Sequence, residues 1–507
     1  MDHDFKEKFI SLKDRLAEIH DISHANAVLG WDQATYMPSG GAVARGRQMA
    51  TLGKLAHEKF TDPALAKLLE DLSHRAEDLD PDGDEARLIQ VVQKDLAKAQ
   101  KIPADFLGRL NVHFAKSYQA WAEARPKNDF ASLQDDLECT LDFSRAYANY
   151  LGYQDHIADP LIGASDEGMS VREVRPLFAE LRKVLVPLVR AVGEAEPLDD
   201  SCLKQFYDKD RQLGVGLELA QTFGYDLNRG RQDLTHHPFC TTFSISDVRI
   251  TTRVNEHDLG DAIFSTLHEA GHALYEQGIH PNLEATPLAS GTSSGVHESQ
   301  SRLWENIIGR SLGFWSYAYP KLQKEFPDQL SKVSLPSFYQ AINKVSPSLI
   351  RTDADELTYN LHVIIRFDLE CQLLEGSLSI ADLPEAWHTR YQQDLGLRAQ
   401  DDRNGVLQDV HWYAGFIGGA FQGYTLGNIM SAQIYQAALK AKPNIPQDIR
   451  QGHFEDLHLW LKSHIYQHGR KFSPNELLKR ATGETLSISP YLDYLREKYA
   501  DLYQISL

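Results

Sequence analysis

Helical periodicity along almost the whole chain is the feature that most constrains its fold. Apolar residues recur at helical spacing, and the breaks between segments carry Pro, Gly, Asp or Asn, which commonly punctuate helices. Such segments bury their apolar faces against one another, so the pattern predicts a mainly α fold. We expect helices over residues 4–30, 43–77, 83–101, 104–125, 130–152, 171–194, 201–224, 258–278, 297–316, 335–345, 353–375, 381–395, 412–440, 446–468 and 473–482.

The helical pattern has no internal division that would mark separate domains. No fixed-period repeat is present, which argues against a solenoid, and no low-complexity tract forms a linker. We therefore expect a single domain over residues 1–507, with two helical lobes around a central groove.

One stretch departs from the helical pattern. Residues 239–254 are rich in β-branched and aromatic residues, and their alternation breaks near Ser246-Asp247. This pattern predicts two short strands joined by a turn, directly before the helix expected over 258–278. An exposed edge strand can bind an extended peptide through main-chain hydrogen bonds, but a hairpin that only packs on helices explains the pattern equally well.

The composition excludes several classes of protein. Apolar residues make up 42% of the 507 residues and charged residues 24%, which is typical of a globular protein with a sizeable core. No stretch reaches the roughly 20 apolar residues of a membrane-spanning helix. The first residues contain no apolar segment of the kind that forms a secretory leader.

Cysteine spacing and net charge further limit the expected cellular compartment and binding partners. Cys139, Cys202, Cys240 and Cys371 are scattered, as expected for reduced thiols in a cytoplasmic protein. The net charge, 52 − 71 = −19, disfavours nucleic acid and anionic membranes as partners. We expect a cytoplasmic protein with neither partner.

The pentapeptide His268-Glu-Ala-Gly-His272 lies within the helix expected over 258–278. Residues four apart project from the same helix face, so the two imidazoles can grip one metal ion. Glu269 lies between them, where it can accept a proton from a water molecule. These three residues form the H-E-x-x-H signature of zinc hydrolases, in which the histidines bind the metal and the glutamate acts on the water. Gly271 indicates close approach of either another backbone or a substrate.

A catalytic zinc site usually has a third protein ligand. Glu298 begins the next expected helix, 298 − 272 = 26 residues after the second histidine, which leaves room for a loop and an antiparallel return. Glu298 is therefore the favoured third ligand. Glu305 is its nearest competitor and is expected to support the site or the fold, whereas Glu276 is expected to point away from the histidine pair.

Several motifs in a fixed order resemble those of the carboxypeptidase Taq family of metallocarboxypeptidases. Besides the two segments around the expected metal ligands, they are His237-Pro-Phe239, Asp247-Val-Arg-Ile-Thr251, Ile350-Arg-Thr-Asp-Ala-Asp355, Gly405-Val-Leu-Gln-Asp-Val-His-Trp412 and, near the N-terminus, Trp31-Asp-Gln-Ala-Thr-Tyr-Met-Pro38. The resemblance covers nearly the full length. It implies a helical fold with a deep groove, like that of the neurolysin and angiotensin-converting-enzyme group, and a homodimer that trims peptides with a free C-terminus.

The resemblance also suggests roles for residues outside the expected metal site. Arg351 is expected to bind the C-terminal carboxylate of the substrate, since a guanidinium can form two hydrogen bonds with it. His411, supported by Tyr424, is expected to stabilise the oxyanion, although a structural histidine and a packed aromatic ring remain alternatives. His237 and Arg249 are expected to shape the groove, and Arg249 can instead pair with Asp247.

The sequence therefore predicts a peptide hydrolase with one Zn²⁺ per subunit, for which Co²⁺ is an alternative because imidazole and carboxylate ligands accept both. Glu269 serves as its general base. An oligopeptidase or endopeptidase with the same metal site is the nearest alternative function. A helical binding protein with a degenerate site is an alternative of another class, which the intact set of expected ligands disfavours.

Overall fold

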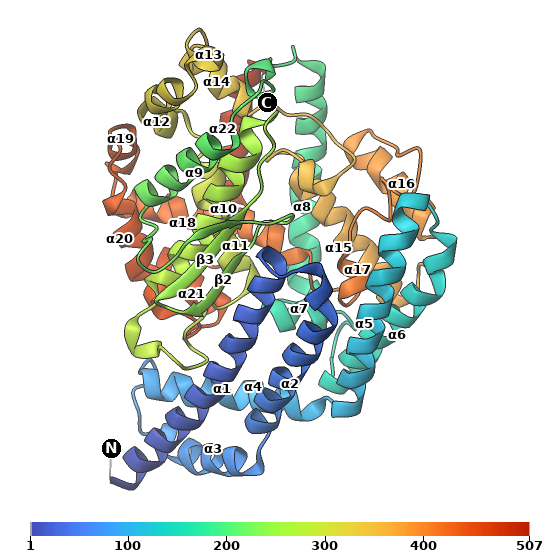
Figure 1. Cartoon of the computed structure of the whole chain (residues 1–507), viewed down its shortest axis with the longest axis vertical. Helices are drawn as coiled ribbons and strands as arrows, with labels where there is room; N and C mark the ends of the chain where they lie inside the picture. Colours follow the sequence, from blue (N-terminus) through green and yellow to red (C-terminus); the bar gives the residue numbers. More distant parts are fainter. Residues whose placement is uncertain (1–2, 506–507) are drawn as a thin grey trace.

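The computed structural model describes residues 3–505, and most of them are helical (Figure 1). The mainly α prediction is confirmed, as is the small sheet beside the helix with the histidine pair. The first part of the chain forms α1 His3–Thr35, α2 Ala42–Phe60, α3 Pro63–Ala76, α4 Asp84–Lys101, α5 Ala104–Ala124, α6 Gln134–Leu151, α7 Asp159–Ser165, α8 Val171–Glu194 and α9 Lys209–Phe223.

The rest of the chain supplies the central helices and the helices that surround them. They are α10 Leu259–Gly278, α11 Ser294–Arg302, α12 Leu312–Glu325, α13 Pro327–Leu330, α14 Leu335–Ile342, α15 Tyr359–Glu375, α16 Leu383–Leu395, α17 His411–Ala414, α18 Gln422–Ala441, α19 Ile445–Arg450, α20 Glu455–His464, α21 Pro474–Thr482 and α22 Ser489–Tyr503. Helices α10, α11 and α18 run side by side through the middle of the molecule (Figure 1).

The sheet has three strands in the order β1-β3-β2. β2 Cys240–Ser244 and β3 Asp247–Thr252 are the two strands expected from the sequence, and they pair antiparallel. β1 Gln232–Leu234 pairs parallel with β3 and was not expected, because three residues are too few to show an alternating pattern. The sheet packs against α10 through β2 and β3.

Helix α10 begins where Asp258 accepts a hydrogen bond from the backbone N–H of Gly260, 3.1 Å away. Its sequence is apolar over most of the surface, and fifteen of its twenty residues are buried, among them Leu267, Ala270 and Leu274. Because this helix is enclosed nearly all round, polar groups on it must find partners inside the protein.

Several expected helices are interrupted in the structure, among them 43–77, which divides into α2 and α3, and 446–468, which divides into α19 and α20. The helix expected over 297–316 ends as α11 at Arg302 and continues as a π-helical segment, Leu303–Ile308, before α12 begins. Gly309 closes that segment with a bond from its N–H to the Trp304 carbonyl, and a Cβ at Gly309 would lie 2.6 Å from the Glu305 carbonyl oxygen. The helix expected over 412–440 contains the glycine-rich loop 415–421, and the regular part resumes as α18.

The buried apolar residues form two clusters. The larger one surrounds α10, α11, α15 and α18. The smaller one lies beneath α1, α3 and α4, where it includes Leu12, Leu69 and Val92. No helix within residues 3–505 is long and apolar enough to cross a membrane.

Candidate active site

A cavity of about 1130 Å³ opens beside α10, α11 and α18. Its walls carry His268, Glu269, His272 and Glu298. They also carry Arg351, which is far from these four residues in the sequence. Other lining residues come from the loop before β2, from the end of β3 and from the start of α18. The cavity therefore joins the expected metal ligands to the residue expected to bind a terminal carboxylate.

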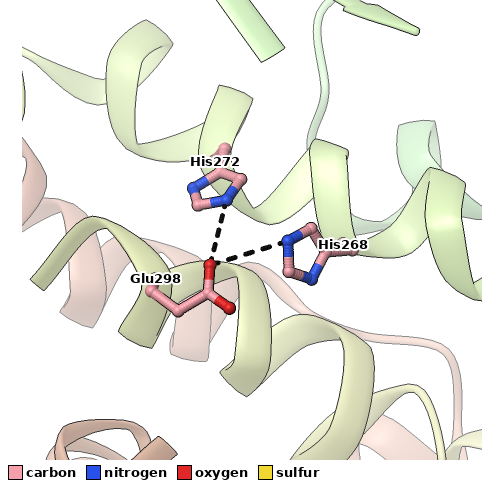
Figure 2. A group of neighbouring side chains, drawn as sticks. All are labelled: His268, His272 and Glu298. Carbon is pink, nitrogen blue, oxygen red and sulfur yellow. Dashed lines mark ion pairs between the residues drawn. The ribbon is translucent and has the colours of Figure 1, made fainter. Parts of the chain in front are cut away.

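The side chains of His268, His272 and Glu298 converge on one point (Figure 2). Oε2 of Glu298 lies 3.6 Å from Nε2 of His268 and 3.3 Å from Nε2 of His272. One donor atom from each residue lies within 4.8 Å of the other two. Two imidazoles and a carboxylate with an open side toward a cavity are the donor set of catalytic zinc sites, so these residues fit a divalent cation.

Charged neighbours hold these donors in place. The Glu298 carboxylate accepts a 2.6 Å hydrogen bond from Nε of Arg302, one helical turn away. The Glu305 carboxylate lies 2.8 Å from Nδ1 of His268 and also accepts from Arg302. Burial disfavours the charged imidazole of His268, yet Glu298 and Glu305 outweigh burial and raise its pKa to about 9. Glu305 thus orients His268 and lies outside the donor set.

Glu269 is buried beside the donors, with 6% of the residue exposed. Burial, together with the negative charges of Glu298 and Glu305, raises the pKa of its carboxyl to about 7. A carboxyl with this pKa can accept a proton and release it again near neutral pH, which suits a general base that later acts as an acid. It also lines the cavity, where a substrate can reach it.

Glycines set the distance between the three central helices. A Cβ on Gly271 of α10 would lie 2.6 Å from the Gln300 carbonyl oxygen of α11. A Cβ on Gly427 of α18 would lie 2.6 Å from Cβ of Glu298. The close approach at Gly271 is therefore a contact between two helices, one of the two possibilities that the sequence left open. The Glu298 carboxylate, one of the three converging donors, lies in a contact that only glycine permits.

Gly427→Ala should lower the free energy of unfolding by about 1–3 kcal/mol, because the added methyl group overpacks the contact with Glu298. Chemical denaturation measures this change. Gly214→Ala in α9 is a matched control, since a Cβ there meets nothing within 4 Å. That control should gain up to about 1 kcal/mol from the better helix propensity of alanine. Equal stability changes in the two variants would contradict the contact.

His411 begins α17 and Tyr424 lies in the first turn of α18, so the glycine-rich loop 415–421 separates them in sequence. Nε2 of His411 is 3.4 Å from the Tyr424 hydroxyl, and Nδ1 is 3.4 Å from the Asp409 carboxylate. Tyr424 lines the cavity, and burial raises the pKa of its hydroxyl. The hydroxyl therefore keeps its proton and remains available as a hydrogen-bond donor.

Arg351 is a buried arginine, with 5% of the residue exposed. Its Nε and Nη2 donate to the two oxygens of Asp409 over 3.1 and 2.8 Å, and Nη1 donates to the Tyr359 hydroxyl over 3.0 Å. The same Asp409 accepts a 2.5 Å bond from Nε of Arg366, which is completely buried. Two guanidinium groups thus share one carboxylate. They hold the pKa of Asp409 well below its usual range, although burial alone would raise it.

A further buried carboxyl, Glu370, lies near Arg366. The carboxylate of Glu370 accepts a 2.8 Å hydrogen bond from the Trp412 indole. Burial raises the pKa of Glu370 to about 7, so a fraction of this group is neutral at neutral pH. Asp409 is thus the carboxylate that bonds to both arginines, and of the two arginines only Arg351 lines the cavity.

Two residues expected to shape the groove have different surroundings. His237 lines the cavity, and its pKa is lowered by burial and by the charge of Arg351. Arg249 donates two 2.8 Å hydrogen bonds to Asp247, and its guanidinium lies 4.5 Å from the centre of the Trp31 ring. The structure thus places Arg249 in the pair with Asp247 that the sequence left as an alternative.

The sequence did not single out some of the residues that surround the donors. Asp409 stands two residues before His411, inside a motif that was recognised, and Arg366 lies in a largely apolar segment with Asp368 and Glu370 close behind it. A buried charge needs a partner, but these two nearer carboxylates keep the sequence from identifying Asp409 as that partner. The expectation that Glu276 points away was wrong. Its position four residues after His272 directs it to the same helix face, where its carboxylate bonds to His297.

Comparison with known proteins agrees with this geometry. The model of the carboxypeptidase Taq (M32) metallopeptidase family matches residues 11–499. The chain belongs to this family. It is 40% identical to thermostable carboxypeptidase 1 of Thermus thermophilus over 492 residues, covering 95% of this chain and 96% of the relative. It is 38% identical to carboxypeptidase 1 of Bacillus subtilis over 502 residues, with 99% of each chain covered.

A solved relative has the same fold. The crystal structure of an M32 carboxypeptidase from Deinococcus radiodurans R1 matches with a TM-score of 0.96 and 50% identity, covering 98% of this chain and 100% of that one. The resemblance inferred from the sequence is confirmed. The protein is a metallocarboxypeptidase that uses a divalent metal and acts on peptides, and nothing favours the oligopeptidase alternative.

Proposed function

We propose that His268, His272 and Glu298 hold one zinc ion per subunit and that Glu269 is the general base. The convergence of the three donors within 4.8 Å carries this proposal. A divalent cation there supplies Lewis acidity, which polarises the scissile carbonyl and lowers the pKa of a water molecule. The same ligands accept cobalt, so zinc and cobalt are to be compared directly.

The residues of the chain divide the remaining tasks. Glu269 accepts a proton from the attacking water and delivers it to the leaving amine. His411 and Tyr424 donate hydrogen bonds to the oxygen on which negative charge develops. Tyr424 lines the cavity, and His411, which is not among the lining residues, lies 3.4 Å from the Tyr424 hydroxyl, on the other side of the loop 415–421 in sequence.

Arg351 binds the C-terminal carboxylate of the substrate. Its fork toward Asp409 is occupied, but a guanidinium has five N–H groups and the bonds to Asp409 and Tyr359 use three of them. The unused N–H groups of Arg351, which lines the cavity, favour an anion at this position. His237 contributes to the wall of the same cavity, and Arg249 supports the sheet beside it.

Arg351→Ala should lower kcat/KM for a free-acid peptide by about 10- to 100-fold, mainly through KM, because a charged hydrogen bond to the substrate is lost. The C-terminally amidated peptide should be cleaved slowly by both proteins, with no further loss in the variant. Arg182→Ala is a suitable control, since Arg182 also pairs with a buried aspartate but does not line the cavity. Equal losses on both peptides would contradict the assignment, and fast cleavage of the amidated peptide would support an endopeptidase.

We further propose one metallopeptidase domain with two lobes around the cavity, assembled as a homodimer in the cytoplasm. The family resemblance supports the dimer. The four free cysteines suit a reducing compartment. Light scattering on the purified protein tests the dimer, because it measures the mass of the particle in solution against 57.2 kDa for one chain.

A further inference from the structure

His272 and His268 differ in the group that contacts the ring nitrogen Nδ1. Nδ1 of His268 meets the Glu305 carboxylate directly, whereas Nδ1 of His272 lies 2.5 Å from Nδ1 of another imidazole, that of His297. Nε2 of His297 lies 2.7 Å from the Glu276 carboxylate. A chain of two imidazoles and one carboxylate therefore leads away from the donor set.

The contacts fix the tautomer of each ring. Nε2 of His272 faces Glu298 and must be free of a proton to bind a cation, so its proton is on Nδ1. His272 then donates to Nδ1 of His297, whose own proton is on Nε2 and is donated to Glu276. Each hydrogen bond has one donor and one acceptor, and the negative charge lies at the end farthest from the donor set.

The surroundings are built to hold this chain of hydrogen bonds. Glu276 is buried and accepts a second hydrogen bond, 3.0 Å long, from the backbone N–H of Gly291. A Cβ on Gly291 would lie 2.4 Å from Cδ2 of His297, so glycine is needed to leave room for the imidazole. The Tyr275 ring also lies against that imidazole, with 5.3 Å between ring centres. Gly291 and Tyr275 thus both restrain the ring of His297.

We propose that His297 and Glu276 are positioning residues that hold His272 in the tautomer and orientation required of a metal ligand. The inference rests on the proposed metal site. His297 is not itself one of the three converging donors, because both of its ring nitrogens are already engaged, by His272 and by Glu276. Residues that orient metal ligands in this way commonly change metal affinity by about 10- to 100-fold when they are replaced.

The test measures the Kd of Zn²⁺ for metal-stripped protein by competition with a chromogenic chelator. His297→Phe keeps a ring against Tyr275 but removes both nitrogens, and it should weaken Zn²⁺ binding about 10- to 100-fold. His297→Asn places an amide oxygen near the position of Nδ1 and should recover part of that loss. Glu276→Gln keeps the acceptor oxygen without the charge. Its Kd for Zn²⁺ should lie between those of His297→Phe and the parent protein.

A matched control comes from another histidine–glutamate pair. His156 lies 2.6 Å from Glu375, outside the cavity, and His156→Phe should leave the Kd unchanged. The thermal midpoint of each metal-free variant separates positioning from stability. A lower midpoint with an unchanged Kd in His297→Phe would overturn the proposal, because His297 would then be structural only.

The double variant His297→Phe with Glu276→Gln tests whether the two residues act together. If they act through one chain of hydrogen bonds, the double variant should bind Zn²⁺ no more weakly than His297→Phe alone. If the losses of Zn²⁺ affinity in the two single variants multiply in the double variant, the proposed chain of hydrogen bonds is overturned. A parent protein that does not bind Zn²⁺ or Co²⁺ would instead overturn the metal site itself, so the two failures are distinguishable.

Discussion

Glu269→Gln should lower kcat by about 10²- to 10⁴-fold while the protein still binds its metal. The amide keeps the size of the side chain but cannot accept the proton of the attacking water. Glu269 lies beside the donors without belonging to the set that converges on one point, so metal binding should survive the change. Release of the C-terminal amino acid from a blocked dipeptide, together with metal content per subunit, measures both quantities.

Glu256→Gln is the control for exchanging a carboxylate for an amide. Glu256 is exposed and does not line the cavity, so this variant should retain the parent rate. Full metal content with a near-normal rate in Glu269→Gln would show that another group accepts the proton. Loss of the metal in Glu269→Gln would instead place Glu269 among the ligands.

Asp409→Asn should lower the free energy of unfolding by about 3–5 kcal/mol, since removal of one member of a buried charge cluster leaves its partners uncompensated. Arg351 and Arg366 would then face each other without a full negative charge, and Arg366 has no exposed surface through which to reach water. Chemical denaturation of the metal-free protein measures the effect apart from metal binding.

The same aspartate should contribute to the acid sensitivity of the protein. Its pKa is depressed in the folded state, so its stabilisation is complete above the unfolded pKa of about 3.9. It is lost as the pH falls from there through the folded pKa. The stability gap between the parent and Asp409→Asn should therefore narrow on acidification below about pH 4. A gap that stays constant over this range would contradict the role of the charge.

Asp394→Asn separates this effect from the general loss of a buried aspartate. Asp394 is also fully buried and also contacts two arginines, Arg182 and Arg390. The side chain of Arg182 is 36% exposed, so it can turn toward water when its partner is lost. Asp394→Asn should accordingly lose less stability than Asp409→Asn. An equal loss would show that burial of the unpaired arginines does not cause the larger effect expected for Asp409→Asn.

The sequence was most informative where chemistry and periodicity coincide. His268 and His272 had to share a helix face because they lie four residues apart, and Glu298 followed from the need for a third ligand on an antiparallel return. The strands β2 and β3 were visible because β-branched residues cluster there. The histidine pair and the two strands depend on residues close together in the chain, where local spacing already limits the geometry. The choice of Glu298, 26 residues after His272, depended also on the family resemblance.

Features that depend on tertiary packing were not visible in the same way. The short helix α7 and the final helix α22 were missed, and α11 was expected to continue without the π-helical segment. The cluster of Arg351, Arg366 and Asp409 joins segments up to 58 residues apart, and no local pattern pairs them. The contact of His297 with His272 likewise required the crossing of α10 and α11 at Gly271.

The glycine contacts between the central helices also bear on attempts to engineer this enzyme. Gly271 touches the backbone of α11 and Gly427 touches the start of the Glu298 side chain, so neither contact leaves space that repacking could give to a new residue. Libraries aimed at substrate preference should therefore leave these positions fixed. They are better directed to Lys204 and Lys344, whose flexible side chains line the cavity and pair with aspartates rather than with a neighbouring backbone.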